Sequence, residues 1–291
     1  MNLLANILCP NPRAVSSPVA RAAISDMTFE VIPLKSLPDA IEQLPANARV
    51  SVTASPVKPL EDTLDVCAEL LEKGHRPIPH IAARKVTDEA HMRSLATRIK
   101  QLGLSEIFCI AGDAQDAGAY HDAMSLLRPL LDFTAGDISA VGVSSYPDGH
   151  AFIDESALHQ ALLDKQELFA EAGIKGHAST QMCFSTDTIR SWLSAQRAEG
   201  FDMPVHLGVA GVVDRAKLIR MGMRLGVGAS LRYVQKNRAG LLKLFSSVGY
   251  NPSDLIDPLA DEFDSMGIEG LHMFTFNQVA ATERWQQAKL G

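Results

Sequence analysis

Glu30 is the residue whose setting most clearly suggests chemistry. It lies in segment 27–35, among β-branched and aromatic residues that favour a buried strand, and Pro33 ends the strand because proline cannot donate to a sheet ladder. Burying an unpaired carboxylate is costly, so an inward-facing Glu30 must be paired or neutral. Two readings follow: a glutamate on an edge strand that faces solvent, or an acid held inside the protein for proton transfer.

Polar side chains also follow other strand-like segments of the chain. Hydroxyl, imidazole, carboxylate and amide groups serve in acid–base catalysis and in the binding of polar ligands. Each of them also has an ordinary explanation as a turn residue, a helix cap or a hydrogen-bonded core histidine. Their shared position at strand ends favours one polar ring, made with Glu30 by Thr53, Ser55, His80, Asp113, Tyr146, His150 and Gln181.

A metal site is the alternative reading of this ring. Carboxylate and imidazole groups of the kinds that divalent ions bind are present in Glu30, His80, Asp113 and His150. The four cysteines contain no C-x-x-C pair, so no thiolate zinc site is indicated. Spacing along the chain does not test a site that closure of the fold would assemble, and we expect no metal.

The elements that must position these residues alternate between strand-like and helix-like segments. The strands read as continuous apolar runs, as parallel strands buried on both faces do. Eight strands, each followed by a helix, predict a closed (β/α)8 TIM barrel, and no G-x-G-x-x-G follows the first strand to favour an open doubly wound sheet. Strands are expected at 27–33, 49–55, 77–83, 107–111, 138–144, 178–184, 205–209 and 271–276, and helices at 36–44, 60–73, 87–102, 119–131, 155–172, 187–198, 215–225 and 278–290.

The domain organisation is expected to be simple. With 291 residues, 46% of them hydrophobic, the chain suits one barrel over 27–291 preceded by an arm or short helix at 1–26. Segment 226–267 is too long for a loop, so extra helices are expected between the seventh helix and the eighth strand, one of them starting near Asn251-Pro252-Ser253. Apolar residues on this insertion, or the N-terminal arm, are candidates for the interface of a homo-oligomer.

The charge of the chain limits its partners. A net charge of -7 disfavours binding to nucleic acid or to an anionic membrane surface, since both need clustered Lys and Arg. No apolar run is long enough to span a bilayer, and segment 1–13 lacks the basic start of a signal peptide. Widely spaced cysteines fit reduced thiols and a cytoplasmic location.

Seven short motifs in order resemble those of the methylenetetrahydrofolate reductase family, and the similarity spans about residues 28–288. The resemblance implies a (β/α)8 barrel that passes hydride from NADH or NADPH through FAD to 5,10-methylenetetrahydrofolate, giving 5-methyltetrahydrofolate. The motifs are Phe29-Glu30, Ser51-Val52-Thr53, Pro79-His80, Gly112-Asp113, Tyr146-Pro147-Asp148-Gly149-His150, Thr180-Gln181-Met182-Cys183-Phe184 and Leu271-His272-Met273-Phe274-Thr275-Phe276-Asn277.

The resemblance also implies roles for the matched residues. Glu30 corresponds to the acid that opens the five-membered ring of the folate to a reducible iminium. Asp113 and Gln181 correspond to residues that bind the pterin, and Phe274 belongs to the same substrate site. The flavin would lie against Thr53, Ser55, His80, Tyr146 and His150.

The chain departs from the family where the FAD phosphates would bind. Ala111 and Gln278 stand where the family commonly has arginine, and on the helix after the fifth strand only Asp164 and Lys165 could replace the usual ligands. Losing such charge-assisted bonds weakens binding by about a few kcal/mol. Weakly bound FAD, direct hydride transfer from NADH and a non-catalytic folate-binding barrel therefore all stay open.

Overall fold

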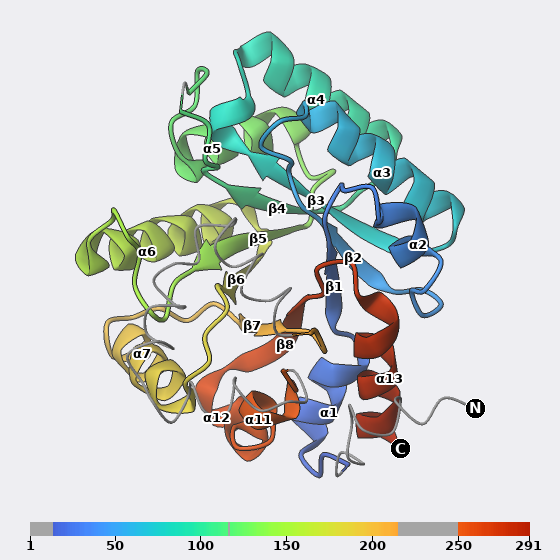
Figure 1. Cartoon of the computed structure of the whole chain (residues 1–291). Helices are drawn as coiled ribbons and strands as arrows, with labels where there is room; N and C mark the ends of the chain where they lie inside the picture. The colour runs from blue at the N-terminus through green and yellow to red at the C-terminus, as the bar shows by residue number, and fades with distance from the viewer. Residues whose placement is uncertain (1–13, 116, 215–249) are drawn as a thin grey trace.

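The computed structural model of the chain describes residues 14–115, 117–214 and 250–291 (Figure 1). In this part of the chain, eight parallel strands pair in sequence order and β8 closes on β1, which confirms the expected (β/α)8 barrel. The strands are β1 (Thr28–Val31), β2 (Arg49–Val52), β3 (Arg76–Ala82), β4 (Glu106–Ile110), β5 (Ala140–Ser145), β6 (Lys175–Thr180), β7 (Val205–Ala210) and β8 (Ile268–Phe274).

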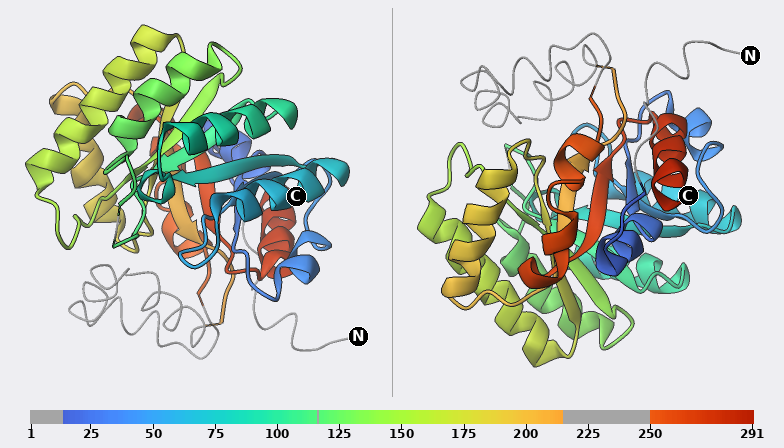
Figure 2. Two further views of the ribbon diagram at one scale, coloured as in Figure 1. Left: turned by 90° about the horizontal axis from the view of Figure 1, so that it is seen from above. Right: turned by 90° about the horizontal axis from the view of Figure 1, so that it is seen from below.

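Helices surround the barrel (Figure 2). The helix expected at 215–225 and the insertion as far as residue 249 lie outside the described residues, and α11 and α12 follow them. The helices are α1 (Pro18–Ser25), α2 (Leu37–Ile41), α3 (Leu60–Glu72), α4 (Glu89–Gln101), α5 (Ala123–Thr134), α6 (Glu155–Ala172), α7 (Thr186–Ala198), α11 (Ser253–Ile256), α12 (Phe263–Met266) and α13 (Val279–Leu290), with 3-10 turns at Ala83–Lys85 and Ala260–Glu262.

Capping residues move two helix starts from their expected positions. Helix α4 begins after Asp88, whose carboxylate accepts from the His91 N–H at 2.8 Å, rather than at residue 87. Helix α5 begins after Asp122, four residues later than expected, because Asp122 and Ser125 form a capping box. At α11, Asn251 Oδ1 accepts from the Ser253 N–H at 3.0 Å, consistent with the predicted helix start there.

Strands β6 and β8 each begin three residues before their expected starts. Strand β6 was expected at 178–184, yet it spans Lys175–Thr180. The reason is that its inward face is polar: His177 and Ser179 point into the barrel and are buried, so an apolar run does not mark the strand. Gln181 therefore directly follows the C-terminal end of β6, the position expected for a member of the polar ring.

Helix α1, which precedes the first strand, contacts the last strand and the last helix of the barrel, β8 and α13. The Gln286 side chain donates to the Ile24 carbonyl at 2.8 Å, and Arg21 donates to the Leu290 carbonyl. These bonds satisfy carbonyl groups in the last turns of α1 and α13, which have no partner within their own helices.

Gly208 on β7 lies where the backbones of two strands approach too closely for a side chain. An ideal Cβ there would lie 1.8 Å from the Thr180 carbonyl oxygen. We expect Gly208→Ala to lower the free energy of unfolding by about 3 kcal/mol or more, measured by urea denaturation. Gly200→Ala is the control: φ is 92° but no atom lies within 4 Å, so backbone strain alone costs about 1–2 kcal/mol. Equal losses would contradict the steric argument.

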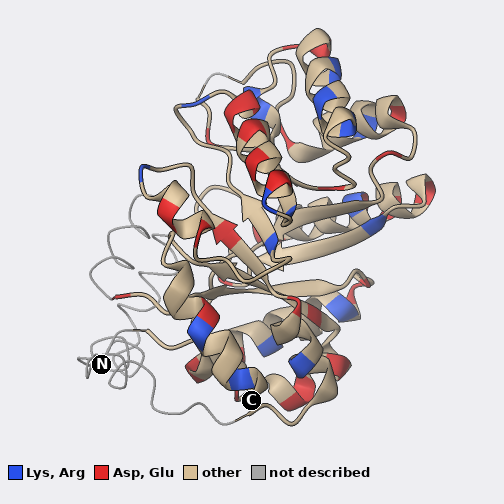
Figure 3. Ribbon diagram, turned by 90° about the vertical axis from the view of Figure 1, so that its right-hand side faces the viewer, with Lys and Arg blue, Asp and Glu red and all other residues tan. Residues whose placement is uncertain are grey.

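The outer surface carries both signs of charge. Figure 3 shows acidic and basic residues interspersed along the ribbon of the outer helices. Among the described residues, no helix combines the length and the apolar character needed to cross a bilayer.

Candidate active site

A cleft of about 1580 Å³ opens at the C-terminal ends of the strands. This is the end of a (β/α)8 barrel at which ligand-binding loops gather. Helix α6 contributes to its wall from the side. Of the residues proposed from the sequence, the cleft lining contains Glu30, Thr53, His80, Asp113, Tyr146, His150, Lys165, Gln181 and Phe274.

Two residues proposed for the site do not line the cleft. Ser55 belongs to the loop after β2, where its carbonyl accepts a hydrogen bond from Lys85. Asp164 accepts from the Gln160 side chain at 2.7 Å on the surface of α6. Adjacent residues on a helix point about 100° apart, so the wall position of Lys165 turns Asp164 away.

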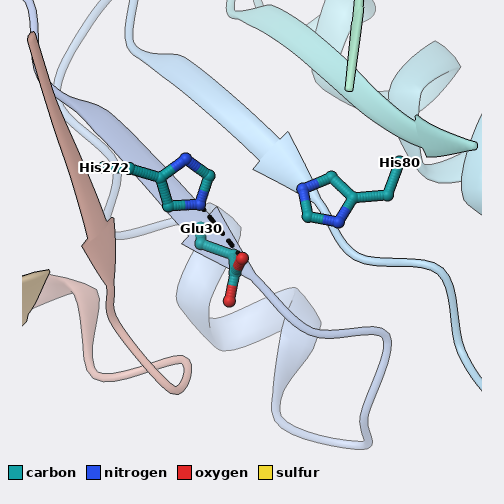
Figure 4. A group of neighbouring side chains, drawn as sticks. All are labelled: Glu30, His80 and His272. Atoms are coloured by element: carbon teal, nitrogen blue, oxygen red, sulfur yellow. Dashed lines mark hydrogen bonds and ion pairs between the residues drawn. The ribbon is translucent and has the colours of Figure 1, made fainter. Parts of the chain in front are cut away.

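Glu30, His80 and His272 form a buried cluster at the base of the cleft (Figure 4). The His272 Nε2 and Glu30 Oε2 atoms are 3.0 Å apart, and these residues are 3% and 6% exposed. His80 Nε2 lies 2.6 Å from Ser51 Oγ, and burial lowers the pKa of His80 to about 3, so its ring is neutral. The reading of Glu30 as a solvent-facing glutamate is therefore wrong, because its carboxyl is buried and paired.

The cluster brings together oxygen and nitrogen atoms that lie within 4.8 Å of one another, a grouping that can surround a divalent ion. Its third member is His272, so Asp113 and His150 do not join the four-residue set considered from the sequence. The Nε2 atoms of His80 and His272 already hydrogen-bond to Ser51 and Glu30. We therefore interpret the cluster as a hydrogen-bonded network.

Flat rings cover the cleft floor beside Glu30. His80 stacks on Phe108 with ring centres 4.6 Å apart, and His272 lies 5.1 Å from Phe274. Such surfaces suit a planar heteroaromatic ligand. Sequence reasoning missed His272 and Phe108 as site residues. The signal was strand alternation, since His272 and Phe274 are two residues apart on β8 and share a face.

The other wall carries polar groups on the segments after β4, β5 and β6. Asp113 is exposed and follows Gly112, whose φ of 85° favours glycine. Gln181 Oε1 accepts from the Met182 N–H at 2.9 Å, which leaves the amide NH₂ for a ligand. Tyr146 donates to Ser144 Oγ at 3.1 Å and lies edge-on to His150, and burial raises the pKa of Tyr146.

The charges of the lining do not fit a tightly held diphosphate. Within the described residues, its only cations are Arg84 and Lys165. The Arg84 guanidinium already donates hydrogen bonds to the backbone carbonyls of Ala114, Gln115 and His121, at 2.7, 3.0 and 3.5 Å. Lys165 donates to the Ala161 carbonyl at 2.7 Å, and burial lowers its pKa. The carboxylates of the lining belong to Glu30, Asp113, Asp122, Glu155 and Asp187.

Fold and site together define a (β/α)8 barrel protein with an acid and planar-ring surfaces in a cleft at the C-terminal ends of its strands. The family model described as methylenetetrahydrofolate reductase matches residues 32–287. The chain therefore belongs to the methylenetetrahydrofolate reductase family, which supports a folate-related oxidoreductase. The match begins two residues after Glu30, so it does not bear on that residue.

One solved structure with a similar course of chain is the apo form of a putative deoxyribose-phosphate aldolase from Toxoplasma gondii. The alignment covers 93% of this chain and 97% of the aldolase chain, with 12% identity and a TM-score of 0.47. A likeness at this level says nothing about substrate.

Proposed function

We propose that this protein interconverts 5,10-methylenetetrahydrofolate and 5-methyltetrahydrofolate, with Glu30 as the acid and NADH or NADPH as the hydride donor. The observation that carries the proposal is the Glu30 carboxyl itself. It is buried at the floor of the cleft in a chain of this family, with Oε2 bonded to His272. An acid there can reach a bound ligand while water is kept from it.

The chemistry assigned to Glu30 is one proton transfer. The O–H bond breaks as a bond forms between the proton and N10 of the folate, and the bond from N10 to the bridging carbon breaks with its electron pair passing to N10. The carbon is left as an iminium on N5. A hydride then adds to that carbon to make the methyl group, and the nicotinamide is oxidised.

The cleft offers groups for the pterin as well as for its reaction. A pterin presents an amide and an amino edge, which a carboxylate and a carboxamide can bind together. Asp113 after β4 and Gln181 after β6 both line the cleft, and we assign them to this edge of the pterin. We assign the planar face of the ring to Phe274, beside His272. Thr53, Tyr146 and His150 are then left for the second planar ligand.

The lining favours hydride transfer directly from the nicotinamide over a relay through resident FAD. A bound flavin would carry the hydride between the two substrates, but among the described residues of the lining only Lys165 has ammonium hydrogens left for a phosphate. Ala111 and Gln278 stand where the family commonly has arginine. Losing the two charge-assisted bonds that those arginines would make weakens FAD binding by about 3–6 kcal/mol, roughly 10²- to 10⁴-fold in Kd. A co-substrate that binds transiently tolerates this loss better than a cofactor that must stay bound.

The test is an anaerobic assay of the purified full-length chain. We expect little or no flavin absorbance after gel filtration, and one 5-methyltetrahydrofolate formed for each NADH or NADPH consumed, with the product identified by mass spectrometry. No product in either direction, with or without added FAD, would leave a folate-binding barrel without turnover and overturn the proposal. A retained flavin that NADH bleaches and the folate restores would support the reaction and contradict the direct transfer.

A further inference from the structure

Strand β8 and the turn after it hold Glu30 at several atoms. His272 Nε2 lies 3.0 Å from Glu30 Oε2, and the Thr275 hydroxyl donates to the Glu30 carbonyl at 2.6 Å. Strands β1 and β8 pair with Thr28 opposite His272 and Glu30 opposite Phe274, so these inward positions are set by barrel closure. The carboxyl and its backbone are thus fixed by one neighbouring strand.

The turn after β8 also forms hydrogen bonds to the segment that directly follows β1. Asn277 Oδ1 accepts from the Ile32 N–H at 2.9 Å, and Asn277 Nδ2 donates to the Ile32 carbonyl at 2.9 Å and to Ser36 Oγ at 3.1 Å. Phe276 and Asn277 have φ values of 49° and 60°, a left-handed conformation that non-glycine residues seldom adopt. A strained turn of this kind persists because these bonds over-determine it.

The two oxygens of the Glu30 carboxyl have different surroundings. Oε2 faces the His272 ring, whereas no group in the described part of the chain hydrogen-bonds to Oε1. The residue lines the cleft. An oxygen that accepts an N–H cannot carry its own proton along the same line, so the acid proton belongs on the other oxygen.

We propose that His272 is a positioning residue whose Nε2–H holds Glu30 Oε2 and so directs the acid proton, carried on Oε1, into the cleft. The inference rests on the proposed function and adds the partner of its acid. When Oε1 gives up its proton, the bond from His272 becomes charge-assisted and therefore stronger, which favours the transfer. His80 stays with Ser51 and takes no part in this bond.

Two substitutions of similar length separate the hydrogen bond from the packing of the ring. His272→Gln keeps an N–H near the position of Nε2, and His272→Met removes it. We expect His272→Met to lower kcat about 10- to 100-fold with little change in the KM for the folate, and His272→Gln to recover most of that loss. In a Glu30→Gln background, His272→Met should remove no further rate, because the histidine acts through the acid.

Equal losses in the Met and Gln variants, a loss confined to KM, or an additional loss in the Glu30→Gln background would overturn the proposal. Nitrogen-15 NMR of histidine-labelled full-length protein tests the same bond without turnover. The His272 signals are those that disappear in His272→Gln, and we expect a proton on Nε2. An unprotonated Nε2 would overturn the positioning role even if the reaction proceeds, whereas a protonated Nε2 in a protein without turnover would place the failure in the proposed function.

Discussion

Glu30→Gln should lower kcat by about 10²- to 10⁴-fold, the usual contribution of a general acid, while the folate still binds with nearly unchanged affinity. Glutamine matches glutamate in shape, and its amide oxygen can still accept the bond that His272 makes to Oε2. An amide cannot supply a proton to the folate nitrogen, so ring opening loses its acid. The measurement pairs steady-state turnover with calorimetric titration of 5-methyltetrahydrofolate.

Glu155→Gln is the matched control, because Glu155 is another carboxylate of the cleft lining and is exposed at the start of α6. It should leave both kcat and folate affinity unchanged. A Glu30→Gln variant with full rate would show that the acid lies elsewhere. Loss of folate binding with kcat retained at saturation would instead make Glu30 a binding residue.

The folded protein should lose stability steeply below about pH 6, because three imidazoles with lowered pKa values, two buried and one half-buried, cannot accept protons without unfolding. Burial lowers the pKa of His80 and of His206 to about 3 and holds that of His177 well below its ordinary value of 6.5. The unfolded chain binds a proton on each ring near 6.5, so between these values it binds more protons than the folded protein. Stability is therefore present above pH 6.5 and falls with pH, by about 4 kcal/mol per unit for three protons.

His206→Gln tests the slope of this loss. His206 stacks on His177 at a ring distance of 3.9 Å near the N-terminal ends of β6 and β7. Removing one imidazole should reduce the slope by about 1.4 kcal/mol per pH unit in urea denaturation between pH 4.5 and 6, whatever it does to stability at pH 7. Gly208→Ala, which lowers stability but removes no titratable group, should leave the slope unchanged. An unchanged slope in His206→Gln would contradict the assignment.

The barrel was predictable because its strands and helices differ in local pattern. Helix α3 places Leu60, Leu64, Cys67 and Leu70 on one buried stripe, and α6 spans the expected 155–172. The pattern was less informative where the barrel interior is polar. The inward face of β6 carries His177 and Ser179, so no apolar run marks the start of this strand, and it was predicted three residues too late.

The sequence by itself determined which residue types stand at the strand ends, because parallel strands in one barrel must bring their C-terminal ends to one face. Only the tertiary structure decided which of those groups meet. Glu30 and His272 are 242 residues apart and touch because β8 pairs with β1. Likewise, the sequence does not show that the carbonyls of Ala114, Gln115 and His121 occupy the guanidinium of Arg84. Which side chains contact one another depends on how the barrel closes and on the conformation of its loops, and the local spacing of residues does not encode either.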